Sequence, residues 1–304
     1  MNTSGKGAGE PRELRRIAVI GFGEAGSILA ADLVVAGCEV ATFDILLNEP
    51  QAGAVMRAKA ERAHVRATES LGGALVDADL VISAVTASSS GDVATLAARS
   101  LHRGQIFLDI NSVSPAKKKS SCHTVEGSGA DYIEAAVMAP LPPQRLKVPM
   151  LLGGARAAAV APALLRLGMN TKAISTQIGI ASAVKMCRSV VIKGIEALAV
   201  ESMLAARHFG AEDQVLASLN QTFPGIGWDR QLPDYLISRV AEHGRRRAAE
   251  MREVARTLED VGIEPTMAAA TAVRQDKFSD AMEAAGVSYR QDEEFSWRAL
   301  VDML

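Results

Sequence analysis

The fold of this chain is decided by eleven residues, Arg16-Ile17-Ala18-Val19-Ile20-Gly21-Phe22-Gly23-Glu24-Ala25-Gly26. A short β-branched run leads into the pattern G-x-G-x-x-G, and an alanine-rich run without glycine, residues 27–36, follows at once. This order predicts a strand, a tight turn and a helix. The first glycine permits the turn, the second lets the backbone approach phosphate groups and the third lets the helix pack against the strand. Because the N–H groups and the positive end of the helix dipole face an anion there, we expect a dinucleotide to bind at this turn.

The residues expected to bind this cofactor are the turn itself and a carboxylate that follows it. Asp44 closes a predicted strand, residues 39–43, about 20 residues beyond the glycines, where the ribose of a dinucleotide lies. An acid at this place accepts hydrogen bonds from ribose hydroxyls and repels a 2′-phosphate, and residues 45–48 offer no Arg or Lys to receive one. The alternative is that Asp44 only caps a turn at the end of its strand. We predict NAD rather than NADP, bound by Gly21, Phe22, Gly23, Glu24, Ala25, Gly26 and Asp44.

The composition is that of an ordinary soluble protein. The 304 residues are enough for two domains, with 48% hydrophobic and 22% charged residues. A formal net charge of −2 and 4% aromatic residues give no basis for binding nucleic acid, and no apolar run reaches the roughly 18 residues of a membrane span. Cys38, Cys122 and Cys187 are widely spaced and the five histidines have no ligand spacing, so we expect no metal site and a reducing cytoplasm.

Two domains are predicted from a change of pattern along the chain. From residue 17 to about residue 174, short apolar runs alternate with helical segments, which is typical of an α/β domain with a parallel sheet. The strands expected after the first two cover residues 80–85, 105–109, 132–137, 148–154 and 171–174. We predict a tail without fixed structure at residues 1–15, a Rossmann-type NAD-binding domain at residues 16–178 and an all-helical domain at residues 179–304.

The second domain is expected to consist of helices alone. Residues 181–209 contain no proline and one glycine, so they can form a single helix. Because that segment is apolar on most sides, we expect the helix to be largely buried. A further helix is expected at residues 250–261. Two runs of like charge, Lys117-Lys118-Lys119 and Arg245-Arg246-Arg247, are interpreted as solvated helix faces, with the arginines kept as a candidate site for an anionic substrate group.

Lys185 is the candidate for chemistry. It lies in the first turns of the long predicted helix, with Arg188 and Ser189 three and four residues further along the same face. Burial and a neighbouring arginine both disfavour the charged form, and they are expected to lower the pKa of the lysine from about 10.4. Such a lysine can take the proton of an alcohol near neutral pH. The alternative is a lysine whose methylenes pack while its ammonium reaches solvent.

Further segments continue the pattern beyond the glycine turn and Asp44. They are Asp109-Ile110-Asn111-Ser112-Val113-Ser114-Pro115, Glu134-Ala135-Ala136-Val137, and Gly179 followed six residues later by Lys185. In this order the features resemble the β-hydroxyacid dehydrogenases, such as 3-hydroxyisobutyrate and 6-phosphogluconate dehydrogenases, and residues 186–194 resemble a less characterised branch with its own C-terminal domain. The resemblance implies that Lys185 is the catalytic acid and base. It also implies that Val85, Thr86 and Ser112 contact the cofactor and that the substrate contacts Asn111, Met138, Arg188 and Ser189.

One stretch departs from the pattern of this superfamily. Relatives carry D-A-P-V-S-G-G, whose glycine N–H groups bind the substrate carboxylate, whereas this chain has Met138-Ala139-Pro140 after Val137. Pro140 has no N–H to donate, and Met138 has no hydroxyl. The asparagine usual four residues after the lysine is Ser189, and the usual late Lys-Asp pair is Ala249-Glu250. We expect carboxylate recognition to be rebuilt, with Arg188 as a candidate, or the substrate to lack a carboxylate.

The function expected from these residues is that of an NAD-dependent oxidoreductase. Hydride would pass between nicotinamide and the carbinol carbon of a hydroxy acid or related alcohol held at the domain cleft, with Lys185 as general acid and base. Two alternatives stay open: an oxidative decarboxylase of a 3-hydroxy acid, and a non-catalytic NAD(H)-binding regulatory protein. The long apolar helix and the resemblance also suggest a homodimer with exchanged helical contacts. The substrate, the direction in the cell and the stereochemistry are left open.

Overall fold

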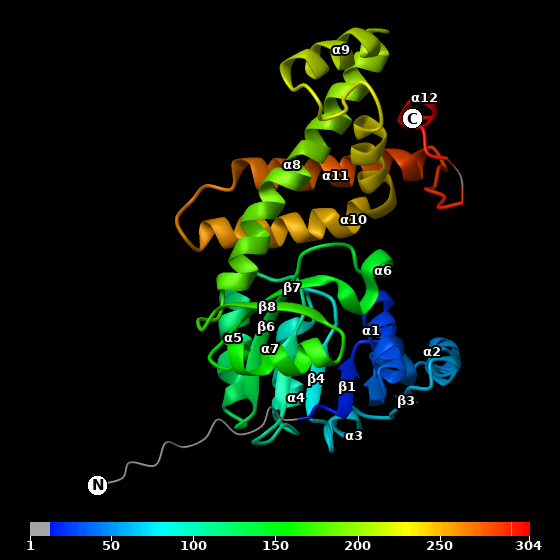
Figure 1. Cartoon of the computed structure of the whole chain (residues 1–304). Coiled ribbons are helices and arrows are strands. Elements are labelled where there is room, and N and C mark those ends of the chain that lie inside the picture. Colours follow the sequence, from blue (N-terminus) through cyan, green and yellow to red (C-terminus); the bar gives the residue numbers. More distant parts are fainter. Residues whose placement is uncertain (1–12, 293) are drawn as a thin grey trace. The chain divides into compact units, whose positions relative to one another are not determined.

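The computed structural model describes residues 13–292 and 294–304, which divide into two compact units between Lys185 and Met186. The first unit is built on an eight-stranded sheet in the order β3-β2-β1-β4-β5-β6-β7-β8 (Figure 1). Neighbouring strands are parallel except for β6 and β7, which are antiparallel. The strands are β1 (Arg16–Ile20), β2 (Glu39–Phe43), β3 (Arg66–Ala67), β4 (Leu80–Ser83), β5 (Ile106–Asp109), β6 (Asp131–Val137), β7 (Pro149–Gly153) and β8 (Asn170–Ser175).

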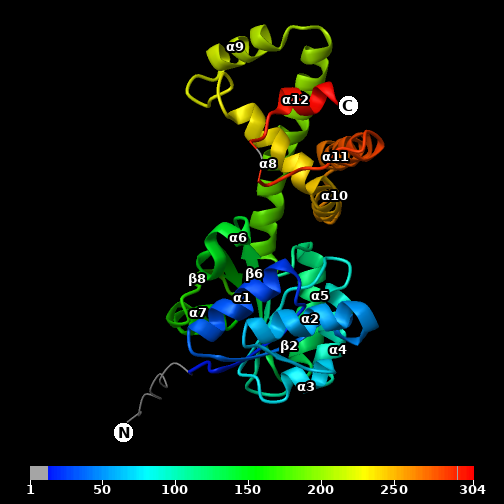
Figure 2. The same ribbon diagram turned by 90° about the vertical axis from the view of Figure 1, so that its right-hand side faces the viewer.

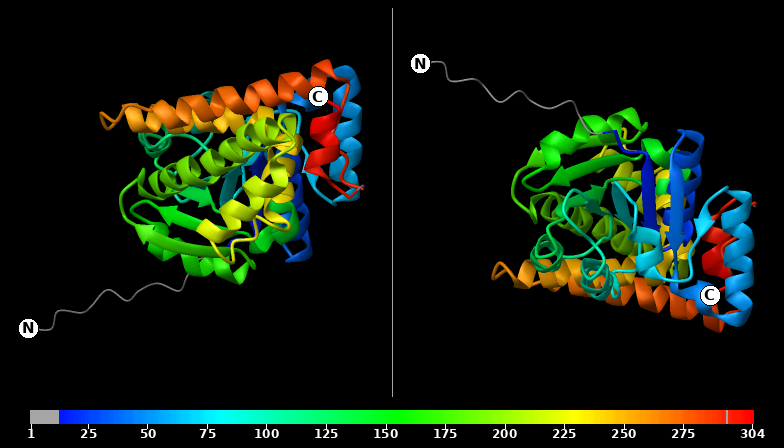
Figure 3. Two further views of the ribbon diagram at one scale, coloured as in Figure 1. Left: turned by 90° about the horizontal axis from the view of Figure 1, so that it is seen from above. Right: turned by 90° about the horizontal axis from the view of Figure 1, so that it is seen from below.

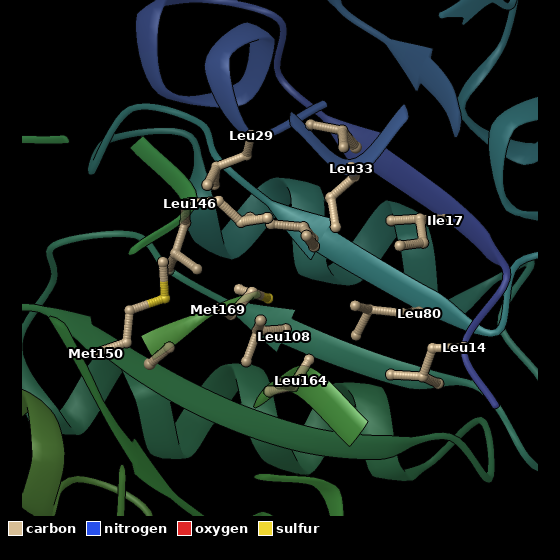
Figure 4. Close-up of a cluster of buried hydrophobic side chains, with 14 of the residues drawn as sticks. Leu14, Ile17, Leu29, Leu33, Leu80, Leu108, Leu146, Met150, Leu164 and Met169 are labelled. Carbon is tan, nitrogen blue, oxygen red and sulfur yellow. The ribbon is translucent and has the colours of Figure 1, made fainter. Parts of the chain in front are cut away.

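Helices cover both faces of this sheet because its strands are apolar on both faces. In β1, Ile17 and Val19 point into one buried cluster, while Ala18 and Ile20 point into the other. The first cluster, which includes Leu14 of the segment before β1, is shown in Figure 4. It is covered by α1 (Glu24–Val35), α2 (Pro50–Arg62) and α7 (Ala157–Arg166), and the opposite face by α3 (Leu71–Leu75), α4 (Ser90–Ala98) and α5 (Pro115–Glu126).

The parallel register brings three polar residues into one row at the carboxyl edge of the sheet. Ser83 ends β4 and pairs with Asp109, which ends β5 and in turn pairs with Glu134 of β6. All three are buried, with at most 1% of each exposed. Since ligands of open α/β sheets bind outside the carboxyl ends of the strands, this row places buried polar groups directly beneath the expected site. Short segments complete the unit: η1 (Ile45–Asn48), α6 (Leu141–Gln144) and η2 (Arg145–Lys147).

Among the described residues of the second unit, the regular secondary structure consists of helices. Its helices α10 and α11 lie side by side (Figures 2 and 3). Their close approach depends on Gly244, because a Cβ there would lie 2.3 Å from the Ser279 hydroxyl oxygen. The helices after the sheet are α8 (Ile180–His208), which begins in the first unit, α9 (Glu212–Thr222), α10 (Leu232–Glu259), α11 (Thr266–Ala284) and α12 (Trp297–Asp302).

The predicted architecture, a Rossmann-type sheet followed by helices, is confirmed. The long helix expected at residues 181–209 is α8, and the one expected at residues 250–261 is the end of the much longer α10. The expectation that α8 is largely buried is wrong, because only one face of it packs within the chain: Val191 is 59% and Leu198 58% exposed. No described helix is long and apolar enough to span a bilayer. Residues 1–12 of the predicted tail lie outside the described residues.

The glycine turn provides a test of the packing between β1 and α1. A Cβ on Gly26 would lie 1.9 Å from the Gly21 carbonyl oxygen, whereas a Cβ on Gly23 would have no atom within 4 Å. Gly26→Ala is therefore expected to lower the free energy of unfolding by at least about 2 kcal/mol, and Gly23→Ala to leave it nearly unchanged. Urea unfolding of the two variants measures this difference. Equal stability of the two would show that the turn is not packed as described.

Candidate functional site

The glycine turn leaves an open surface at the start of α1. Gly21 has a φ of +88°, which favours glycine, and its N–H donates to the Phe43 carbonyl at 2.9 Å. The first N–H groups of α1, like those of any α-helix, have no partner within the helix. No side chain caps them either. Because the space around Gly23 is also open, an anionic group can approach these N–H groups closely. The turn thus fits the diphosphate of a dinucleotide.

Asp44 links the end of β2 to this turn. One carboxylate oxygen accepts from the Phe22 N–H at 2.6 Å, and the other accepts from the Leu46 N–H at 3.0 Å. Asp44 therefore caps the η1 turn, as the alternative interpretation has it, and it also contacts the glycine turn. A carboxylate can accept about four hydrogen bonds, so the two N–H donors leave acceptor capacity for ribose hydroxyls.

Asn111 joins the ends of β4 and β5. Its side-chain oxygen accepts from the Val85 N–H at 2.7 Å, and its side-chain N–H donates to the Ser83 hydroxyl at 2.9 Å. Beside Val85, the hydroxyl of Thr86 lies 3.0 Å from the hydroxyls of both Ser88 and Ser89. Asn111 is 5% exposed, and the hydrogen bonds of its amide hold the ends of the two strands together. The neighbouring Ser112 is positioned as a consequence.

A buried ion pair lies under the same loop. The Lys118 ammonium donates to the Asp109 carboxylate at 2.9 Å and to the Asp109 carbonyl at 2.8 Å. The carboxylate also accepts from the Tyr132 hydroxyl at 2.7 Å and from the Asn111 N–H at 2.9 Å. Burial and the Asp109 charge raise the pKa of Tyr132 well above its usual value, which keeps this hydroxyl a donor. Three groups, from α5, from β6 and from the loop after β5, are thereby fixed to one carboxylate.

The position of Lys118 corrects the interpretation of residues 117–119 as a solvated helix face. Lys118 is 1% exposed. A helical period could have revealed this, because Lys118 shares the inward stripe of α5 with Ser121 and Val125, three and seven residues further on. The run of three lysines hid the pattern, since like charges in sequence suggest solvent exposure.

Glu134 caps the first turn of α8. One carboxylate oxygen accepts from the Gly179 N–H at 2.7 Å and the Ala181 N–H at 3.0 Å, and the other accepts from the Ser182 hydroxyl at 2.8 Å and the Ser182 N–H at 3.3 Å. Glu134 is fully buried, so these donors replace all its water contacts. Its antiparallel partner Gly153 allows this geometry, because a Cβ there would lie 2.5 Å from the carboxylate. The sequence did not reveal this capping role.

Lys185 lies one turn beyond this cap and reaches the loop after β5. Its ammonium donates to the Ser112 hydroxyl at 2.5 Å. Lys185 and Ser112 are both half-buried and belong to the first unit. The structure thus brings together the lysine singled out for chemistry and the serine expected to contact the cofactor, although 73 residues separate them.

In the stretch that replaces the carboxylate-binding glycines, Met138 and Pro140 have no N–H to offer a carboxylate. The Met138 N–H already donates to the Pro149 carbonyl at 2.9 Å, which extends the β6–β7 pairing. Pro140, at the start of α6, has no N–H. Of the other expected substrate contacts, Arg188 is exposed and Ser189 is 8% exposed, and both lie on α8 in the second unit.

The arginines considered for an anionic substrate group are largely paired with carboxylates. Arg245 contacts Asp280 at 2.6 Å and Glu283 at 2.9 Å, both on α11. Arg247 donates to Glu196 on α8 at 2.7 Å. Because their charges are offset within their own unit, these two side chains are poor candidates for substrate recognition. Among the described residues, no group of three or more His, Cys, Asp or Glu side chains is arranged to hold a metal ion.

The sheet, the open glycine turn and the carboxylate beside it define a dinucleotide-binding protein of the Rossmann type. Residues 16–174, more than half of the chain, match the family described as the NAD binding domain of 6-phosphogluconate dehydrogenase. Residues 206–278 match a domain of unknown function, DUF1932. The chain therefore belongs to this NAD-binding family, within the β-hydroxyacid dehydrogenase superfamily and in a branch with a distinct C-terminal domain.

Similar proteins agree with this assignment. A conserved hypothetical protein from Sinorhizobium meliloti 1021 is 36% identical, with 96% of each chain covered and a TM-score of 0.75. The conserved protein MTH1747, described as structurally similar to 3-hydroxyacid dehydrogenases, is 30% identical over 87% of this chain and 97% of its own, with a TM-score of 0.69. Mitochondrial 3-hydroxyisobutyrate dehydrogenase from Drosophila melanogaster is 24% identical over 72% of this chain and 66% of its own length.

Glu134→Gln tests whether the buried carboxylate holds the start of α8. The amide would present N–H donors to backbone N–H groups, so we expect the free energy of unfolding to fall by about 3 kcal/mol. Urea unfolding measures this loss, and hydrogen exchange is expected to speed up at residues 179–185. The exposed Glu61→Gln on α2 is the matched control. Stability and exchange equal to those of the control would contradict the capping role.

Proposed function

We propose that this protein is an NAD-dependent oxidoreductase that interconverts a hydroxy acid, or a related alcohol, with its carbonyl compound. The observation that carries the proposal is the contact between Lys185 and Ser112, at 2.5 Å, above the carboxyl ends of β5 and β6. An NAD-binding domain of this family supports redox chemistry, and a lysine at its carboxyl edge supplies a group that can move a proton.

Lys185 is proposed to act as the general acid and base. When bound, NAD supplies the hydride acceptor. In the oxidation direction the neutral amine takes the hydroxyl proton of the substrate at Nζ, and in the reduction direction the ammonium returns it to the carbonyl oxygen. Ser112 holds the amine in place by its hydrogen bond, and Glu134 fixes the first turn of α8, one turn before Lys185. The lysine is thus positioned before substrate arrives, which lowers the cost of ordering it.

The substrate class follows from what replaces the usual carboxylate contacts. The Met138 N–H is already paired and Pro140 has none, so these two residues cannot bind a substrate carboxylate through their N–H groups, and Arg188 is the side chain proposed to bind it. A neutral alcohol needs no such partner. A panel of 2- and 3-hydroxy acids, sugar acids and alcohols without a carboxylate separates these cases by initial rates of NADH formation.

Lys185→Met tests the proposed chemistry. Loss of the acid and base is expected to lower turnover by roughly 10²- to 10⁴-fold on any substrate that the panel identifies. The dissociation constant of NADH, measured by calorimetry, is expected to change by less than about twofold, because Lys185 moves a proton and does not hold the diphosphate. The exposed Lys172→Met in β8 is the matched control.

Two outcomes would overturn this assignment. If Lys185→Met loses NADH affinity together with turnover, Lys185 has a structural role. If the wild type binds NADH tightly but turns over no member of the panel, the protein is a non-catalytic NAD(H)-binding regulator. The paired Met138 N–H and the proline at 140 are the observations that favour this second candidate.

We also propose that two copies of the chain form a homodimer through α8. Val191, Ile195 and Leu198 follow one another at spacings of four and three, which places them on one face of the helix, and they are 59%, 39% and 58% exposed. Burial of such an apolar face against a second copy of the chain is more favourable than its exposure to water. The three free cysteines fit the further proposal of a reducing, cytoplasmic location.

Leu198→Glu tests the dimer. A charge in the middle of the apolar face is expected to convert a dimer of the wild type into a monomer, as measured by light scattering after gel filtration. Leu165→Glu is the matched control, since Leu165 on α7 is 52% exposed but lies outside this face. A wild type that runs as a monomer, or a variant that stays dimeric, would contradict the proposal.

A further inference from the structure

Lys59 contacts the glycine turn from α2. Its ammonium donates to the carbonyl oxygens of Phe22 and Gly23, each at 3.2 Å. The same ammonium lies 5.4 Å from the centre of the Phe22 ring, which is fully buried. Two hydrogen bonds and a cation–π contact therefore hold a positive charge against the turn that fits the dinucleotide.

Two opposite charges flank one residue of this turn. The Phe22 N–H donates to the Asp44 carboxylate at 2.6 Å, while the Phe22 carbonyl accepts from Lys59. The expectation of NAD rather than NADP rests on residues 45–48, which directly follow Asp44 and contain no cation. That expectation does not take account of Lys59, which lies in the last turn of α2 and contacts the glycine turn in the folded chain.

A cation in this place changes what the ribose site can accept. Asp44 alone would repel a phosphate on the ribose, but a nearby positive charge offsets that repulsion. An ammonium carries three N–H donors, and the two turn carbonyls take two of them, which leaves one for a ligand oxygen. Lysine binds phosphate as a compact point charge and needs no bidentate geometry.

We propose that Lys59 is a coenzyme-specificity residue: its ammonium offsets Asp44 and receives the 2′-phosphate of NADPH, so that the site binds NADPH as well as NADH. The proposal rests on the cofactor-binding part of the proposed function and not on Lys185 or on turnover. It can therefore be tested by binding alone, without a substrate.

The test compares the dissociation constants of NADH and NADPH, measured by calorimetry, for the wild type and Lys59→Met. Removal of the charge is expected to weaken NADPH binding on the order of tenfold and NADH binding by less than about twofold. The smaller probes 2′-AMP and 5′-AMP are expected to show the same contrast, because only the first carries the 2′-phosphate. The loss for NADPH is expected to shrink as the salt concentration rises, since the effect is electrostatic.

Arg57→Met is the matched control. Arg57 lies two residues earlier on α2 and donates to the Leu47 carbonyl at 2.8 Å, so the variant removes one cation from the same helix without touching the glycine turn. Both NADH and NADPH are expected to bind this control as they bind the wild type. Lys59→Gln serves as a second variant should Lys59→Met lose thermal stability.

Three results would overturn the proposal. If Lys59→Met weakens the binding of NADH and NADPH equally, Lys59 supports the turn or contacts the diphosphate. Unchanged binding of both would remove Lys59 from the site. A wild type that binds NADH but rejects NADPH would show that Asp44 prevails, and it would leave the proposed NAD-dependent function intact. Turnover with NAD, combined with NADPH binding that Lys59→Met leaves unchanged, would contradict this proposal and leave the proposed function intact.

Discussion

The candidate site depends on one buried interaction, the carboxylate of Glu134 against the first turn of α8. Glu134 is fully buried, and its two oxygens accept four hydrogen bonds from residues 179–182. A buried carboxylate is costly unless its acceptors are satisfied, so the chain is held in the one arrangement that satisfies them. That arrangement starts α8 at a fixed point above the sheet, and the position of Lys185 follows from it.

The rest of the site repeats this principle along neighbouring strands. Glu134 of β6, Asp109 of β5 and Ser83 of β4 form a row set by the parallel register, and each of the three accepts a hydrogen bond from a group outside its own strand. Because the carboxyl ends of these strands meet at one edge of the sheet, the groups they hold converge there. Ser112, between the Asn111 and Pro115 positions, is thereby presented to Lys185. The NAD-binding family of residues 16–174 accounts for the sheet, and this row accounts for the site built on it.

Sequence could predict the features that depend on local pattern. The glycine turn, the place of Asp44 and the bounds of α8 follow from spacing and helix-breaking residues over short stretches. Sequence could not predict features that depend on contacts between distant residues. These are the burial of Lys118 within a run of lysines, the capping by Glu134, and the contact of Lys59 with the glycine turn. The apolar surface of α8 was misjudged for a related reason, since composition shows that a helix is apolar but not which faces find partners within one chain.

We propose that Lys185, held by Ser112 on the helix whose first turn Glu134 caps, stands where hydride transfer takes place. A crystal structure of the protein with NADH bound would show whether this is so. We expect the diphosphate to lie on the glycine turn and the nicotinamide ring to lie beside Ser112, with its C4 atom and the Lys185 amine facing one substrate-sized space. A nicotinamide ring bound away from Ser112, or a Lys185 amine turned to solvent in that complex, would contradict it.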